Sequence, residues 1–248
     1  MRFPCKIKNN SGPKMVTWAD GTDEEIVAML EAHYNGDIDI HDYWTVGDER
    51  VVNLSAMAAT GVGETHAAQS VTLVLSNAGG KYLADEVTEC AFQWDQKNCL
   101  LETGYMNASD TNTGGWKNSA RRTWCNNVYY NAIPATLRPI FKQHKNLSGL
   151  GNSSTSGVER TTDYVALRAE IEIFGTRSFS VEDEGSQVTY YQTSANRIKN
   201  LGDAGSSSAW WERSPRSKRS SFCSVNYDGN ASSDFAYYLI GLSLCGCL

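Results

Sequence analysis

The sequence predicts a mixed α+β fold with mainly antiparallel strands, two helices in the body of the fold, and irregular loops. Three observations support this class. A capped amphipathic segment precedes several strand-like segments, helical spacing occupies the middle of the chain, and short Ser- and Tyr-rich strand segments follow Trp210. With 248 residues, the chain is long enough to bury a full hydrophobic core.

The first helix is expected between Thr22 and Gly36. Thr22 or Asp23 is suited to the N-cap, and Ile26 and Leu30 share one apolar stripe. Gly36 is suited to end the helix, because glycine readily adopts the left-handed conformation that often follows a last helical turn.

Three strand-like segments follow this helix. Residues 37–54 alternate like two strands joined by a turn at Gly47-Asp48. Residues 69–80 carry another strand signal that ends in two glycines, and residues 89–106 contain a further candidate strand. Together these segments predict a sheet.

The middle of the chain changes to helical spacing. Residues 119–147 predict two consecutive helices, of which the second begins at Pro134 and ends near Gly149. Residues 149–162 predict a Gly/Ser-rich loop within one domain, and residues 178–200 predict a polar excursion with one short helix.

Composition limits the classes of partner. The net charge is −6, with 41% hydrophobic and 20% charged residues, which is typical of a folded globular protein and not of a basic nucleic-acid-binding surface. Residues 1–14 lack the apolar segment of a signal peptide, and the chain has no run of about 18 apolar residues. We therefore expect no nucleic-acid partner, no secretion by that route and no membrane insertion.

The seven cysteines and four histidines form no known catalytic or metal motif. Cys245 and Cys247 would share one face of a strand, but they leave a metal two ligands short, so we expect buried, reduced thiols. His41-Asp42 is the close histidine–carboxylate pair, and we expect it to form hydrogen bonds within a turn. The sequence thus predicts no enzyme active site, no metal and no cofactor.

The strongest functional signal lies in residues 210–248. Lys, Glu, Gln, Trp and Met make up 42 of the 248 residues, so about five or six would be expected after Pro215, yet the 33 residues there contain one, Lys218. The other residue types present can all be reached from an Asn codon by changing its adenines. This bias is typical of adenine-directed codon diversification, and an ordinary Ser/Tyr-rich β surface is the alternative.

The same segment has the composition of a binding surface. Tyr provides a large contact area at low entropic cost, while Ser, Asn and Asp form adaptable hydrogen bonds. The expected aromatic anchors are Tyr227, Phe235, Tyr237 and Tyr238, with Arg216 and Arg219 as charged contacts. The framework expected to hold them consists of Trp210, Trp211, Arg213, Pro215, Phe222, Val225, Gly229 and Gly241.

Four ordered motifs resemble one known family. They are WWERSP with FCSVNYDGNAS (residues 210–232), YWTVGDERVVNL (residues 43–54), ARRTWCNNVYYN (residues 120–131) and DYVALRAEIEIFG (residues 163–175), the last resembling a strand motif. They are similar to the motifs of a widespread bacterial and phage domain family of unassigned function. That family belongs with the C-type-lectin fold of the formylglycine-generating-enzyme-like branch, which is the scaffold used by the variable proteins of diversity-generating retroelements. The resemblance covers about 200 residues, from Tyr43 onward.

This resemblance implies an organisation and a role. Residues 1–36 would be an N-terminal helical segment, residues 37–248 a C-type-lectin-like ligand-binding domain, and residues 210–248 its variable region. The protein would be a receptor-binding component of a phage or prophage, located in the virion or in the cytoplasm of the host bacterium. Its partner would be a protein or glycan on a target cell surface, and the helix at residues 22–35 could dock to a virion tail partner or an oligomer.

The resemblance also assigns individual positions. The diversified residues would be Arg216, Ser217, Arg219, Ser220, Ser221, Ser224, Tyr227, Ser232, Ser233, Asp234, Phe235, Tyr237, Tyr238, Leu239 and Ile240. Two departures from the family pattern stand out: Glu212 replaces a common Leu, and GLSLCGCL replaces a proline-containing ending.

Three alternative functions have different sequence support. A formylglycine-generating type of enzyme would use Cys245 and Cys247 as metal-binding thiolates, but no supporting His or carboxylate motif accompanies them. A calcium-dependent lectin would need Glu/Asn-Pro-Asp/Asn and Trp-Asn-Asp motifs, which are missing. A structural virion protein with a solvated Ser/Tyr-rich β face remains open.

Overall fold

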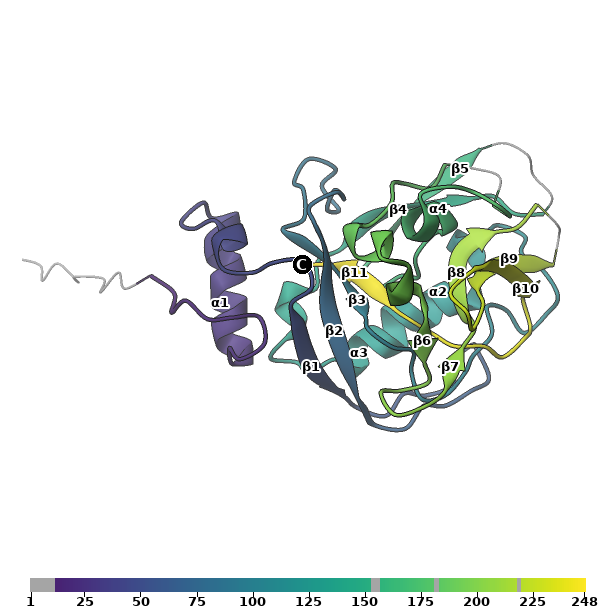
Figure 1. Cartoon of the computed structure of the whole chain (residues 1–248), viewed down its shortest axis with the longest axis horizontal. Coiled ribbons are helices and arrows are strands. Elements are labelled where there is room, and N and C mark those ends of the chain that lie inside the picture. The colour runs from purple at the N-terminus through teal and green to yellow at the C-terminus, as the bar shows by residue number, and fades with distance from the viewer. Residues whose placement is uncertain (1–11, 153–156, 181–182, 218–219) are drawn as a thin grey trace, which may run out of the picture.

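The computed structural model describes residues 12–152, 157–180, 183–217 and 220–248, and it has the predicted mixed α+β architecture (Figure 1). Most strands are antiparallel and lie in several small sheets. The helices are α1 (Asp23–Tyr34), α2 (Ala120–Trp124), α3 (Tyr130–Ala132) and α4 (Glu170–Phe174). The strands are β1 (Glu49–Leu54), β2 (Gln69–Ala78), β3 (Phe92–Gln96), β4 (His144–Gly149), β5 (Val158–Asp163), β6 (Lys199–Asn200), β7 (Ser207–Ser208), β8 (Trp210–Pro215), β9 (Ser221–Val225), β10 (Ala231–Phe235) and β11 (Cys245–Cys247).

Helix α1 begins and ends as the sequence predicted. The Thr22 hydroxyl accepts the Glu25 backbone N–H at 3.3 Å, and the Glu25 carboxylate accepts the Thr22 N–H at 3.0 Å, which forms a capping box. Gly36 follows the helix with a φ of 78°. The buried Ile26 and Leu30 join the same hydrophobic cluster as the strands, so α1 packs on the body of the fold, and the division at residue 36 stays a prediction.

The larger sheet has the strand order β1-β2-β3-β11, and all three pairings are antiparallel. The last strand therefore pairs with β3, where Cys245 lies opposite Asp95. On its other side, β11 forms backbone bridges at Ala166 and Lys142. This places the end of the chain beside strands from its first half, as Figure 1 shows.

A smaller sheet has the order β10-β9-β8, with antiparallel pairings. Every residue of β8 and β9 is buried, whereas the residues of β10 are half-buried or exposed. The main hydrophobic cluster includes the fully buried Trp94, Trp124 and Trp211, and a second cluster contains Trp210 and Tyr191. None of the helices in the described part of the chain is long and apolar enough to cross a membrane.

The prediction of a second helix after Pro134 is wrong. Residues 120–132 form one helix with a π-helical turn at Cys125–Tyr129, and a 3-10 turn at Arg138–Ile140 and strand β4 follow it. Pro139 lies inside the expected second helix, where its ring and missing N–H oppose helical hydrogen bonding. Strand β4 pairs with β5, which lies in the segment that predicted a loop.

Two strand predictions are also wrong in part. Residues 163–175 contain the short helix α4, because only Asp163 belongs to a strand and the helix begins at Glu170. Residues 37–46 contain a 3-10 turn at Ile40–Asp42, which the Asp39 carboxylate caps by accepting the His41 N–H.

The polar residues 178–200 contain two 3-10 turns, Thr189–Gln192 and Ser194–Arg197, where one short helix was predicted.

Candidate ligand-binding surface

The framework residues expected around the variable region are all buried. They are Trp210, Trp211, Arg213, Pro215, Phe222, Val225, Gly229 and Gly241. Arg213 illustrates how they hold β8 in place. Its guanidinium donates to the backbone oxygens of Leu147, Leu167 and Glu184 and to the Glu172 carboxylate at 2.5 Å. A buried charge with this many acceptors fixes strand β8 to three other segments.

The predicted variable positions fall into four groups. Ser217, Tyr227, Phe235, Tyr237, Tyr238 and Leu239 are exposed. Arg216, Ser220, Ser232, Ser233, Asp234 and Ile240 are half-buried. Ser221 and Ser224 are buried, and Arg219 lies outside the described residues. The structure therefore leaves twelve of the described positions with side chains that reach solvent.

The exposed residues at the end of β10 and directly after it form one aromatic patch, which we define as Phe235, Tyr237, Tyr238 and Leu239. The ring of Phe235 lies 6.0 Å from that of Tyr237 and 5.4 Å from that of Tyr238, measured between centroids, and the two tyrosine rings are 5.0 Å apart. The four side chains are between 42% and 59% exposed. Desolvation and the neighbouring Tyr238 raise the pKa of Tyr237, so its hydroxyl is a neutral donor and acceptor.

The backbone under the aromatic patch is held by residues from elsewhere in the chain. The Ala236 carbonyl accepts the N–H groups of Met106 at 2.9 Å and Asn107 at 3.1 Å. Gly104 and Ile240 exchange two backbone hydrogen bonds, at 2.9 and 3.2 Å. These contacts do not involve the side chains of the patch. The patch residues could therefore change without losing the bonds that place them.

A buried asparagine fixes the other end of the segment in the same way. The side-chain amide of Asn112 donates to the backbone oxygen of Arg216 at 2.9 Å and to that of Ser221 at 2.7 Å. The Arg216 N–H also donates to the Ser221 carbonyl at 3.0 Å. The sequence assigned residues 104–112 no part in the binding surface, because a contact to main-chain groups far away in the chain leaves no pattern in residue type.

Three placements differ from the expected surface. Tyr227 lies on the turn between β9 and β10, at the opposite end of β10 from Phe235, so it is separate from the other aromatics. Ser221 and Ser224 are buried, and the Ser224 hydroxyl donates to the carboxylate of the half-buried Asp234 at 2.6 Å. Arg216 is engaged within the protein, since it donates to the Ser233 hydroxyl and lies over the Phe179 ring.

The cysteines that suggested a metal–thiolate enzyme are deeply buried. Cys245 and Cys247 both lie on β11 and are inaccessible to solvent. Burial raises the pKa of Cys245 to about 11, and burial with a hydrogen bond to Cys90 raises that of Cys247. Thiolate formation is therefore opposed at both positions. The six cysteines within the described residues are free thiols.

A cleft of about 290 Å³ lies away from the aromatic patch and has charged walls. The Lys81 ammonium is 2.8 Å from the Glu172 carboxylate, which also accepts from Arg213. The Glu184 carboxylate accepts the Gly149 N–H at 2.5 Å and the Ser214 hydroxyl. Burial raises the pKa of Glu184 to about 7. Since these buried groups already have partners within the chain, the cleft offers a ligand few free polar contacts.

The fold and this surface define a mixed α+β protein with an aromatic patch beside the edge strand of a small antiparallel sheet. Residues 78–242 match the family described as a domain of unknown function, DUF6273, and the chain belongs to this family. The matched region contains all of β3 to β10 and the aromatic patch. Comparison with curated proteins and comparison with solved structures each found no match.

Proposed function

We propose that the protein is a non-enzymatic receptor-binding variable protein that displays a diversified surface on a C-type-lectin-like scaffold. The surface comprises the aromatic patch with the neighbouring half-buried residues of β10. Its ligand is a protein or glycan on a target cell, and the protein acts in a phage or prophage tail or in a related surface-recognition particle. This role extends the resemblance noted for residues 43–248.

One observation carries the proposal. The side chains at the expected variable positions mostly reach solvent, while the backbone that bears them is held by main-chain bonds and by the buried Asn112. A surface that varies without unfolding its domain requires this separation of backbone support from side-chain identity. The codon-related bias after Pro215 points to the same residues independently.

The chemistry of the patch suits a macromolecular surface. Three aromatic rings in mutual contact offer a large apolar area with two hydroxyl groups, and tyrosine loses little entropy on binding. Half-buried Ser232, Ser233 and Asp234 add hydrogen-bonding groups beside it. Such a surface binds weakly as one copy, and repeated copies on a particle could raise the avidity by ~10²–10⁴.

The first test is genetic. The DNA flanking the gene is sequenced and searched for a near-copy of the codons for residues 210–248 and for a reverse-transcriptase gene. The proposal predicts a copy whose differences fall at template adenines and cluster at the exposed positions. A flanking region without such a copy would contradict diversification and favour the structural virion protein.

The second test measures binding. The purified protein is labelled and applied to a panel of intact bacterial cells, and the double variant Tyr237→Ser/Tyr238→Ser is compared with Tyr82→Ser. Tyr82 is a matched control because it is 57% exposed and lies at the charged cleft. We expect the double variant to lose binding and the control to keep it. Loss of binding in Tyr82→Ser alone would place the ligand in the cleft.

A further inference from the structure

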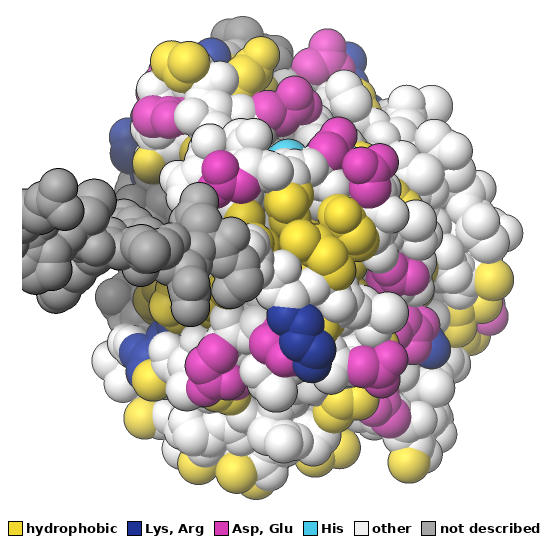
Figure 2. All heavy atoms as spheres, turned by 90° about the vertical axis from the view of Figure 1, so that its left-hand side faces the viewer, with side chains coloured by type: hydrophobic (Ala, Val, Ile, Leu, Met, Phe, Trp, Pro, Cys, Tyr) yellow, Lys and Arg dark blue, Asp and Glu magenta, His cyan; other side chains and the backbone are white. Residues whose placement is uncertain are grey.

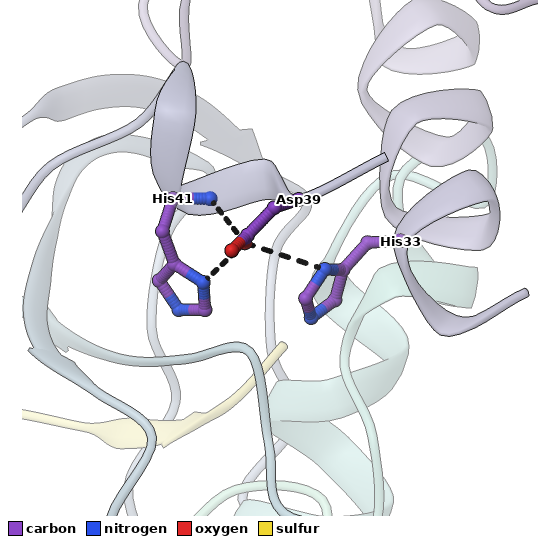
Figure 3. A group of neighbouring side chains, drawn as sticks. All are labelled: His33, Asp39 and His41. Atoms are coloured by element: carbon purple, nitrogen blue, oxygen red, sulfur yellow. Dashed lines mark hydrogen bonds and ion pairs between the residues drawn. The ribbon is translucent and has the colours of Figure 1, made fainter. Parts of the chain in front are cut away.

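Three side chains with metal-ligand atoms meet between α1 and β1. His33 lies in the last turn of α1, whereas Asp39 and His41 lie at the 3-10 turn that follows. Figure 3 shows the three side chains directed toward one another. Their nitrogen and oxygen ligand atoms all lie within 4.8 Å of one another. Two imidazole rings and one carboxylate therefore lie close enough together to contact one ion at the surface.

The hydrogen bonds of His41 orient its ring for coordination. Its Nε2 faces the Ala91 carbonyl oxygen at 3.0 Å, so Nε2 is the nitrogen that donates. Metal-bound histidines usually donate their second ring N–H to a carbonyl or carboxylate in this way. The other nitrogen, Nδ1, faces the Asp39 carboxylate at 2.7 Å. The ring is further held by contact with Phe92, whose centroid is 4.8 Å away.

The Nδ1 of His33 lies near the same carboxylate, and its lone pair is engaged by a backbone N–H that a metal ion would displace. Its Nδ1 accepts the Ile40 N–H at 3.3 Å, which requires a lone pair on that atom. The distance from this Nδ1 to Asp39 Oδ1 is 3.9 Å. Tetrahedral ligands about 2.0–2.1 Å from a zinc ion lie about 3.3–3.4 Å from one another. The two measured separations, 2.7 and 3.9 Å, lie on either side of this value, so small side-chain rotations would equalise them.

We propose that His33, Asp39 and His41 bind a divalent transition-metal ion, with Zn²⁺ as the preferred ion. Imidazole nitrogen with one carboxylate oxygen suits zinc better than calcium or magnesium, which favour oxygen ligands. The ion would fix the end of α1 to the turn before β1 and leave one coordination position for water. The side chains are 20%, 62% and 38% exposed, respectively, so an ion can reach them. Figure 2, which faces the α1 side, shows a histidine at the surface among acidic side chains.

A turn stabilised by hydrogen bonds alone is the competing explanation. The sequence predicted that His41 would bond within a turn, and it does so with Asp39, two residues earlier. That explanation also covers His33, which comes from a different element and accepts the N–H of Ile40 in the turn. Metal binding that depends on all three side chains would therefore separate the two explanations.

The experiment titrates Zn²⁺ into the untagged, chelator-treated full-length protein by calorimetry, and Co²⁺ by absorbance. Cys5 is replaced by Ser in every protein, because it lies outside the described residues and could bind the ion. The variants are His33→Gln, Asp39→Asn and His41→Gln. Asp42→Asn is the matched control, since Asp42 is an exposed carboxylate on the same turn but outside the group. Far-UV circular dichroism confirms that each variant is folded.

We expect one equivalent of Zn²⁺ in the parent and in Asp42→Asn, a higher melting temperature with the ion, and no thiolate-to-cobalt band. Each ligand variant should bind at least about tenfold more weakly, since even the loss of an outer-sphere partner costs about 10–100-fold. Absence of binding in the parent would overturn the proposal. So would binding that all three variants keep, or a thiolate band, because either result places the ion elsewhere. If one variant fails to fold, the Zn²⁺ affinities of the other two variants test the proposal.

Discussion

Replacing the buried Glu212 should make the protein more stable, and more so at neutral than at acidic pH. Glu212 lies on β8 and is fully buried, and neither of its carboxyl oxygens has a hydrogen-bond partner among the residues that the structure describes. Burial, followed by repulsion from Glu170 and Glu184, raises its pKa well above the usual value of 4.5. Between pH 4.5 and this raised pKa, the group is therefore neutral in the folded protein and ionised in the unfolded chain.

The size of the effect follows from two contributions. Neutralising the carboxyl on folding costs about 1.4 kcal/mol for each pH unit above its usual pKa of 4.5, until the folded-state pKa is reached. Burying a polar group without a partner costs a further ~1–3 kcal/mol. Glu212→Gln removes the first contribution, and Glu212→Leu, which restores the residue common in the similar family, removes both. The raised pKa means that the wild-type loses stability as the pH increases from 4.5 toward the folded-state pKa.

Urea denaturation followed by circular dichroism at pH 4.5 and pH 7 measures these contributions. We expect the free energy of unfolding of Glu212→Gln to exceed that of the wild-type by little at pH 4.5. The difference should grow by about 1.4 kcal/mol per pH unit toward pH 7, until the folded-state pKa of Glu212 is reached. Glu212→Leu should be more stable than Glu212→Gln at both pH values. Equal pH dependence in the wild-type and in Glu212→Gln would refute the reasoning, because it would mean that the folded carboxyl is ionised at pH 7.

Three further predictions concern other parts of the fold. Thr22→Ala should lower the free energy of unfolding by about 1 kcal/mol in urea denaturation, because it removes the N-cap of α1, and no change would contradict the capping box. Arg168→Leu should cost about 3–5 kcal/mol because it leaves Asp95 buried without its guanidinium at 2.6 Å, whereas a loss below 1 kcal/mol would show that water or another group replaces it. Tyr237→Ser should change the free energy of unfolding by less than about 0.5 kcal/mol, since the residue is 44% exposed. A larger loss would mean that the aromatic patch stabilises the fold.

The sequence predicted those elements whose signals are local. Helix α1 has its cap, apolar stripe and terminating glycine within fifteen residues, and the centre of β2 from Val71 to Leu75 is β-branched or apolar at every position. Strand β4 could not be predicted, because its buried side chains include the polar His144, Asn146 and Ser148, so hydrophobic alternation is absent. Their partners come from β5 and other distant segments. Helix α4 is five residues long, too short to display a helical period.

The residue composition of the candidate surface could be predicted from the sequence, but the contacts that hold its backbone could not. The residues after Pro215 show their bias directly in the sequence, and most of them reach solvent. The role of Asn112 in holding Arg216 and Ser221 depends on a tertiary contact across about a hundred residues. The burial of Ser224 likewise depends on the pairing of β9 with β10. All residues of β9 are buried, so the alternation of side chains along this strand does not show from the sequence which of them would reach solvent.

The position of β11 has a consequence for how variation could be tolerated. This strand follows the candidate variable residues in the chain, yet it is needed to complete the main sheet between β3 and the backbone near Ala166. A premature stop or a shift of reading frame within residues 216–240 would remove β11 and leave the core open. If those residues vary as proposed, variants with a premature stop or a frameshift would not fold. Only proteins translated in frame through β11 would fold and reach a target.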